Sequence, residues 1–242
     1  MESSPWGEME VVVMFPFFFD PTFIVLIPAL ILAVWAQTRV KSAFNRYSKV
    51  RARRGVTARD AVRTILDSNG LNSVPVERVP GALTDHYDPR KKVLRLSESV
   101  YGSPSIAAIG VAAHEAGHAI QDARGYAPLK LRNAFVPVAS LGSSLALPLF
   151  FIGFLFANPT MMDLGIIFFA AVLLFHLVTL PVELDASKRA LSILSDSGLL
   201  ASDEIGGAKA VLNAAALTYV AATLMSALQL VRLFLLRGMR NR

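Results

Sequence analysis

The sequence of 242 residues contains no cysteine. This absence excludes disulfide scaffolds, iron–sulfur clusters, cysteine-ligated zinc and cysteine nucleophiles. Charged residues are also scarce, at 17%, while apolar residues reach 54%; average soluble domains contain about 25% and about 45–50% respectively. The composition is therefore that of a membrane protein. Its excess of basic residues is interpreted as a signal of membrane topology, and no nucleic-acid partner is expected.

Lysine and arginine are absent from residues 1–36, which carry four acidic residues. A cleavable signal peptide begins with a cationic segment, so none is predicted here. Seven basic residues then cluster between Arg39 and Arg54. Because such a cluster beside a membrane helix marks the cytoplasmic side, the N-terminus is expected to lie outside. Binding of anionic lipid headgroups is an alternative role for the cluster, and the two roles are compatible.

The first apolar segment is Val11–Ala36, which Asp20 and Pro21 interrupt. These two residues are typical of a helix N-cap followed by proline at the first helical position. A helix is therefore predicted over Phe23–Ala36 and beyond. This run is shorter than the ~20 residues that a spanning helix needs, so Val11–Phe19 would complete the crossing or lie in the interface.

Two longer apolar runs, Ala134–Ala157 and Met161–Val182, are joined by the short connection at residues 158–160. They predict a transmembrane hairpin whose two ends face the cytoplasm. A last apolar helix is predicted over Lys209–Leu236, and it spans the membrane, is re-entrant or lies in the interface. Its end is rich in arginine, which the positive-inside rule disfavours on the outer side. Three or four transmembrane helices are thus expected.

Residues 55–133 form the one sizeable polar stretch and predict a small α+β region on the cytoplasmic side. The expected helices are one that Thr57 caps and that runs through Leu66, and one that Ser103 caps and that runs to about Asp122. Between them an extended segment is expected at Pro75–Val79, followed by strands at Gly81–His86 and Lys92–Leu96 that a turn at residues 88–91 joins. The fold class is therefore mainly α, a membrane protein with a small α+β insertion.

The sharpest local signal is the segment His114-Glu115-Ala116-Gly117-His118, in the last of these helices. Histidines four positions apart lie on one helix face, where both can bind the same Zn²⁺. Glu115 stands beside the first histidine and can act as general base on a water molecule. The other residues of this helix are small and apolar, so the helix is expected to be buried. The alternative to a zinc site is therefore a buried, hydrogen-bonded histidine pair.

A catalytic zinc site needs three protein ligands and one open position. Without cysteine, the third ligand must be His, Asp or Glu, and three candidates stand near the end of the hairpin: His176, Glu183 and Asp185. Glu183 is preferred, because a carboxylate at that depth is costly unless it is coordinated or paired. The alternative is an ion pair with Arg189 or with another basic residue. Asp185 is interpreted as orienting a ligand histidine, and His176 as a hydrogen-bonded group inside the bundle.

These motifs, with residues 83–89 (Leu-Thr-Asp-His-Tyr-Asp-Pro) and residues 183–187 (Glu-Leu-Asp-Ala-Ser), resemble the YugP-like bacterial membrane family of neutral zinc metallopeptidases over nearly the whole chain. The resemblance implies a gluzincin-like endopeptidase embedded in the membrane, with Zn²⁺ as its cofactor. By this resemblance Glu115 is the base. The implied zinc ligands are His114, His118 and Glu183.

Other residues are candidates for supporting roles. In the wider gluzincin class an Asp that orients a ligand histidine often stands four residues after the ligand Glu. This chain has Ser187 at that position, so Asp185 is an alternative for the orienting role. Peptide hydrolysis also needs a donor for the oxyanion. Tyr219 in the last helix, and His86 with Tyr87 in the predicted hairpin, are candidates, although a structural role is the alternative for each.

In the class that the motif resembles, an edge strand pairs with an extended substrate, and this role is expected for strand Lys92–Leu96. An ordinary hairpin that covers the helix is the alternative. The chain is accordingly divided into four segments. Residues 1–54 hold the N-terminal membrane helix and the basic cluster, and residues 55–133 the metalloprotease core. Residues 134–182 hold the transmembrane hairpin, and residues 183–242 the third ligand and the last helix.

The preferred function is a zinc-dependent endopeptidase of the bacterial cytoplasmic membrane, with its active site on the cytoplasmic side. Its expected partners are the lipid bilayer and a protein or peptide substrate that is associated with the membrane; an oligomer or a regulatory partner is left open. One alternative is a non-enzymatic scaffold whose structural zinc is closed by a fourth ligand such as His86 or His176. Another is an ion-conducting protein in which His176 and Glu183 line the path.

Overall fold

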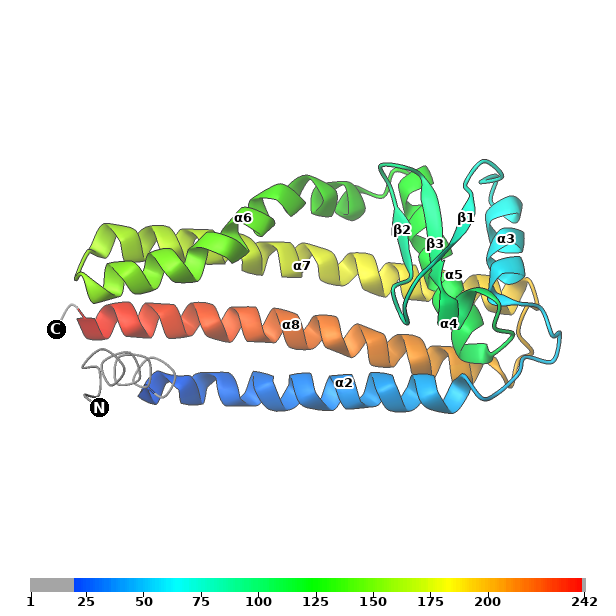
Figure 1. Cartoon of the computed structure of the whole chain (residues 1–242), viewed down its shortest axis with the longest axis horizontal. Coiled ribbons are helices and arrows are strands. Elements are labelled where there is room, and N and C mark those ends of the chain that lie inside the picture. The colour runs from blue at the N-terminus through cyan, green and yellow to red at the C-terminus, as the bar shows by residue number, and fades with distance from the viewer. Residues whose placement is uncertain (1–19, 241–242) are drawn as a thin grey trace, which may run out of the picture. The chain divides into compact units, whose positions relative to one another are not determined.

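The computed structural model describes residues 20–240. The expectations for Val11–Phe19 and for the acidic residues before them lie outside this range. Within it the chain is mainly helical and has one small sheet (Figure 1). The mainly helical fold class and the presence of a small sheet are therefore confirmed.

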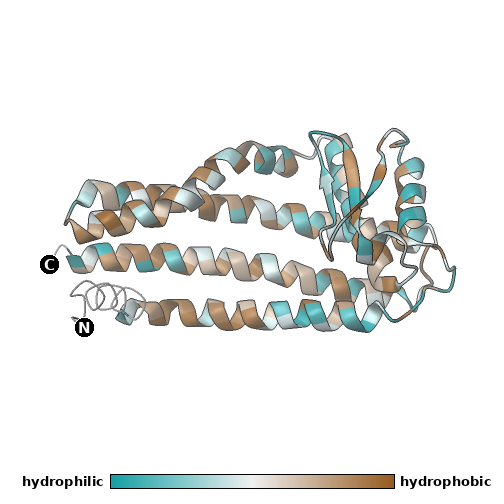
Figure 2. Ribbon diagram, in the orientation of Figure 1, coloured by the Kyte–Doolittle hydropathy of each residue, from teal (hydrophilic) through white to brown (hydrophobic). Residues whose placement is uncertain are grey.

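Within residues 20–240, four helical segments are long and apolar enough to cross a membrane. They are the 3-10 helix η1 (Pro21–Leu26) continued by α2 (Ile27–Tyr47), α6 (Ala127–Leu155), α7 (Pro159–Asp196) and α8 (Ile205–Arg240). Asp20 caps the first as predicted, because its side chain accepts a hydrogen bond from the Thr22 N–H at 2.8 Å. Apolar residues are distributed along all four segments (Figure 2). Most of the exposed large hydrophobic residues of the described chain lie on these segments. Such surfaces are suited to contact with lipid.

The helices α6 and α7 are each longer than the apolar run that predicted them. Pro137, Pro148 and Pro181 all lie inside helices. Proline is tolerated in apolar, packed helices because neighbouring groups satisfy the carbonyl that it leaves free. Since α7 continues through Pro181 to Asp196, Glu183 lies on the hairpin helix itself.

One compact unit consists of residues 20–32, 137–174 and 221–240. In it, Gly142 of α6 and Gly165 of α7 let the two helices approach closely, since a Cβ on either glycine would lie 2.7 Å from a backbone atom of the other helix. Small residues at such a contact are typical of helix pairs in membranes.

A second compact unit consists of residues 33–136 and 175–220. It contains α3 (Ala58–Ser68), the sheet, the short α4 (Glu98–Tyr101) and α5 (Ile106–Ala123). The helix α5 is almost wholly buried, and α3, α4 and the sheet pack against it. Because α5 is covered by these elements, it consists mainly of small apolar residues.

The predicted caps of α3 and α5 had different outcomes. Thr57 caps α3 as predicted, accepting a hydrogen bond from the Asp60 N–H. The prediction for α5 was wrong by two residues, because Ser105 is the cap in place of Ser103. The carbonyls of Ser103 and Pro104 accept hydrogen bonds from the N–H groups of residues 58 and 52, so the helix begins only after them.

The three strands found in the described residues lie in the order β1-β3-β2. β1 (Val76–Val79) is parallel to β3 (Val93–Ser97), and β2 (His86–Asp88) is antiparallel to it. The strand predicted at Gly81–His86 was wrong: Gly81 and Leu83 have positive φ angles of 97° and 57°, which an extended strand does not accommodate. The prediction of an edge strand at Lys92–Leu96 was also wrong, because β3 is paired on both sides. The edge that contacts α5 belongs to β2.

Gly117 sets the distance between α5 and α7. A Cβ on Gly117 would lie 2.7 Å from the carbonyl oxygen of Ala186, closer than carbon and oxygen normally approach. Glycine in a helix interior costs roughly 0.5–1 kcal/mol relative to alanine, and here the cost is offset by the close contact. The contact places the histidine motif against the residues that follow Glu183.

We expect Gly117→Ala to destabilise the protein by about 1–3 kcal/mol, because the added methyl must push α7 away. Thermal unfolding in detergent should show a lower Tm, together with loss of bound zinc. Gly206→Ala in α8 is the matched control, since its Cβ would have no atom within 4 Å. A Gly117→Ala protein with the stability and zinc content of the control would contradict this packing.

Candidate metal centre

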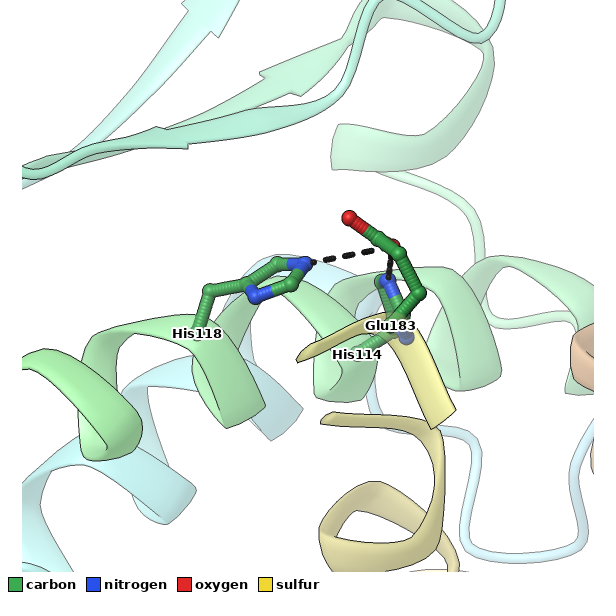
Figure 3. A group of neighbouring side chains, drawn as sticks. All are labelled: His114, His118 and Glu183. Carbon is green, nitrogen blue, oxygen red and sulfur yellow. Dashed lines mark hydrogen bonds and ion pairs between the residues drawn. The ribbon is translucent and has the colours of Figure 1, made fainter. Parts of the chain in front are cut away.

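Three predicted ligand residues come together in the structure: His114 and His118 from α5, and Glu183 from α7 (Figure 3). The Oε2 atom of Glu183 lies 3.2 Å from His114 Nε2 and 3.5 Å from His118 Nε2. The two imidazole rings meet edge to face, with their centroids 4.8 Å apart. In the part of the chain that is described, this is the one group of three such residues that could hold a metal ion.

The spacings from Glu183 to the two histidines fit a tetrahedral zinc ion, and the ligand atoms of the three residues all lie within 4.8 Å of one another. Zinc lies about 2.0–2.2 Å from histidine nitrogen and carboxylate oxygen, so two tetrahedral ligand atoms are about 3.3–3.5 Å apart. The distances from Glu183 to the two histidines, 3.2 and 3.5 Å, agree with this geometry. Two imidazoles and one carboxylate are also a donor set of catalytic zinc sites, which keep a fourth position open.

The charge of the group favours a cation. Glu183 is 3% exposed and His118 is 8% exposed. Burial alone disfavours a charged imidazole, but the hydrogen bond to Glu183 and the charges of Glu115 and Glu183 outweigh it and raise the pKa of His118 above its usual range. A site that draws a proton onto an imidazole also attracts a metal cation, which would displace that proton.

Gln121 determines which nitrogen of His118 can bind a metal. The amide nitrogen of Gln121 donates to the Val182 carbonyl at 2.9 Å and to Asp185 at 2.8 Å, so both of its N–H groups are used. Its amide oxygen, which can only accept, lies 3.0 Å from His118 Nδ1. In neutral His118 the proton is therefore on Nδ1, and Nε2 presents its lone pair to the site.

The sequence left the orienting role open between Ser187 and Asp185. Ser187 contacts a histidine, whereas the direct contact expected of Asp185 is made by Gln121. The hydroxyl of Ser187 lies 3.1 Å from His114 Nδ1, so the position four residues after Glu183 does contact a histidine. Asp185 reaches His118 through the amide of Gln121. Orientation is thus provided by a hydroxyl and an amide, where carboxylate–histidine pairs are common in zinc sites.

The candidate base, Glu115, is 9% exposed. Its Oε2 accepts a hydrogen bond from the backbone N–H of Tyr87, on the edge strand β2, at 3.0 Å. The base and the three ligand residues line one cavity, which is formed by Asp85, His86, Tyr87, Pro89, His114, Glu115, His118, Leu129, Arg132, Asn133, Glu183 and Tyr219. A substrate in this cavity would meet the metal position and the base together.

Two candidate oxyanion donors, Tyr219 and His86, also line this cavity. The phenol of Tyr219 is hydrogen-bonded to Glu183. His86 Nδ1 donates to the Thr84 carbonyl at 2.9 Å, which leaves Nε2 as an acceptor, and Nε2 lies 3.4 Å from Arg95 Nη1. In this geometry His86 has no ring N–H left for an oxyanion.

The side chain of Tyr87 anchors β2 to α5. Its hydroxyl donates a hydrogen bond to Asp122 at 2.9 Å. Burial, together with this bond, raises the pKa of Tyr87 above its usual range, so the phenol stays protonated. The preceding loop is fixed by Asp85, which accepts a hydrogen bond from the Ser97 N–H at 2.7 Å. Burial raises the pKa of Asp85 even though the Ser97 bonds oppose this shift.

His176 is not among the residues that line this cavity. Its ring packs against Phe175, with the centroids 6.0 Å apart.

Two residues of the site were missed by sequence reasoning. Gln121 had a usable signal, because it stands three positions after His118 on the same helix. Arg132 had none, since an arginine before an apolar run is normally interpreted as a topology signal.

Comparison with known proteins shows the family of this chain. Residues 22–238 match the model of a family described as "Putative neutral zinc metallopeptidase". The chain is 51% identical over 206 residues to the "Putative membrane protease YugP" of Bacillus subtilis (strain 168), an alignment that covers 85% of this chain and 92% of that protein. No solved structure matches the chain. The chain therefore belongs to this zinc metallopeptidase family.

We expect Gln121→Leu and Ser187→Ala each to weaken zinc binding by about 10- to 100-fold, because each removes the partner of a histidine Nδ1. Zinc affinity can be measured by competition with a chromogenic chelator. Ser192→Ala is the matched control on α7, since Ser192 bonds to Asp196 away from the cavity. Wild-type affinity in both Gln121→Leu and Ser187→Ala would show that neither partner orients the histidines.

Proposed function

We propose that this protein is a membrane-embedded endopeptidase that hydrolyses peptide bonds with zinc held by His114, His118 and Glu183. The observation that carries the proposal is the presence of Glu115, a buried carboxylate, in the same cavity as the three ligand residues. A structural zinc site needs no base, and it would be closed by a fourth ligand. In residues 20–240 the group of candidate ligands has three members.

Each residue of the cavity has a distinct part in this chemistry. Zinc, when bound, supplies a Lewis acid that lowers the pKa of water to about 7. Glu115 accepts a proton from the attacking water and returns it to the leaving amine nitrogen. The N–H of Tyr87 holds the Glu115 carboxylate in place before the reaction. Gln121 and Ser187 hold the two imidazoles in the orientation that exposes Nε2.

The edge of β2 is suited to align an extended substrate. The N–H of Tyr87 points to Glu115 and therefore away from β3, so the backbone of this residue faces the cavity. A peptide that pairs with this edge would present its scissile carbonyl to the metal position. This role replaces the one that the sequence predicted for Lys92–Leu96.

We place the metal centre at the cytoplasmic face of the bacterial inner membrane. The basic end of α2 belongs to the same compact unit as the metal centre, and basic clusters mark the cytoplasmic side. The helix α8 has 36 residues and is about 54 Å long, which favours a spanning helix over an interfacial one. Two arginines towards its outer end are then paired, Arg232 with Asp20 and Arg237 with Asp163.

We expect Glu115→Gln to abolish proteolysis and to leave bound zinc unchanged, because the amide keeps the shape of the base and loses its proton acceptor. Cleavage of casein in detergent and zinc content by mass spectrometry measure the two effects. Exposed Glu98 in α4 provides the matched control, Glu98→Gln. Full casein cleavage by Glu115→Gln would exclude Glu115 as the base.

The proposed topology predicts the labelling of introduced cysteines, and the chain has no native cysteine to interfere. We expect Thr160→Cys in intact cells to react with a maleimide that does not cross membranes. We expect Arg90→Cys to react only after lysis. Both positions are exposed in the structure, so the difference reports the side of the membrane, and the reverse pattern would place the metal centre outside.

A further inference from the structure

Arg132 brings a cation into the cavity of the metal centre. It lies on α6, and its Nη1 is 3.4 Å from Glu183 Oε1. The two oxygens of Glu183 therefore have separate partners, since Oε2 faces the two histidines. The other charged residues that line the cavity, histidines aside, are acids: Asp85, Glu115 and Glu183.

The guanidinium of Arg132 has more donors than the structure uses. It carries five N–H groups. Among the described residues, its side-chain hydrogen bond is made to Glu183. Its Nε is buried and has no hydrogen-bond partner among these residues. A buried donor without a partner is costly. An acceptor that enters the cavity during the reaction would remove this cost.

We propose that Arg132 is a catalytic residue that donates a hydrogen bond to the oxyanion of the scissile carbonyl. The proposal rests on the endopeptidase function proposed above. As the water oxygen bonds to the carbonyl carbon, the π electron pair of the C=O bond moves to oxygen, and Glu115 takes the proton of the water. Arg132 stabilises the new negative charge and stays protonated throughout. When the C–N bond breaks, its electron pair stays on nitrogen, which takes the proton from Glu115, and the C=O bond forms again.

The geometry favours Arg132 over the donors that the sequence suggested. Tyr219 has one O–H, and it is hydrogen-bonded to Glu183. His86 donates its ring proton to the Thr84 carbonyl. Arg132 can keep its bond to Glu183 and donate to an oxyanion at the same time, and its full positive charge makes each such bond stronger than a neutral one.

The test compares Arg132→Met and Arg132→Lys with Lys130→Met, a control that removes a cation from the same helix outside the cavity. Three quantities are measured in the zinc-loaded protein: zinc content, kcat and KM for an internally quenched peptide with an amidated C-terminus, and the calorimetric Kd of a phosphinic peptide that mimics the tetrahedral oxyanion. We expect Arg132→Met to keep its zinc, to lose roughly 100- to 1000-fold in kcat with KM within about threefold, and to bind the phosphinic peptide more weakly by a similar factor. Arg132→Lys should recover part of both losses, and Lys130→Met should equal the wild type.

Three outcomes would overturn the proposal. Loss of zinc in Arg132→Met would mean that Arg132 only holds Glu183. A higher KM confined to peptides with a free C-terminal carboxylate would assign Arg132 to the substrate terminus. Unchanged kcat and phosphinic-peptide affinity would exclude any contact with the oxyanion. If the wild type holds zinc and cleaves no peptide, the endopeptidase function fails, and binding of the phosphinic peptide still decides the role of Arg132; a wild type that neither cleaves nor binds overturns both.

Discussion

The carboxylate of Glu183 connects four helices of one compact unit. Its Oε2 faces His114 and His118 of α5, its Oε1 faces Arg132 of α6, and Tyr219 of α8 is hydrogen-bonded to it. A carboxylate in an apolar helix is expensive to bury, and several partners must share its charge. Removal of one partner of such a buried pair costs about 3–5 kcal/mol. The metal centre and the packing of these helices therefore depend on the same group.

The contact between α5 and α7 makes this arrangement possible. Glycine at position 117 brings the backbone of α5 against Ala186, and the residues around Ala186 then meet the motif from the other side. Ser187 contacts His114, while Gln121 spans from His118 to Val182 and Asp185. Both histidines are oriented by neutral groups.

Local patterns predicted the three candidate ligand residues. Histidines four positions apart must share a helix face, and a carboxylate at membrane depth requires a partner, so His114, His118 and Glu183 could be named in advance. The strand positions were less predictable, because the positive φ of Leu83 depends on the loop that Asp85 fixes to β3. Arg132 could not be identified at all, since its role follows from tertiary contact with Glu183 and leaves no local pattern.

The central claim is that Glu183 completes a zinc site with the two histidines. The most direct test is the zinc content of the purified protein, prepared without chelators, for the wild type, Glu183→Ala and His176→Ala. We predict one zinc per chain in the wild type and in His176→Ala, which changes the same helix outside the cavity, and almost none in Glu183→Ala. Full zinc in Glu183→Ala, or none in the wild type, would contradict the account.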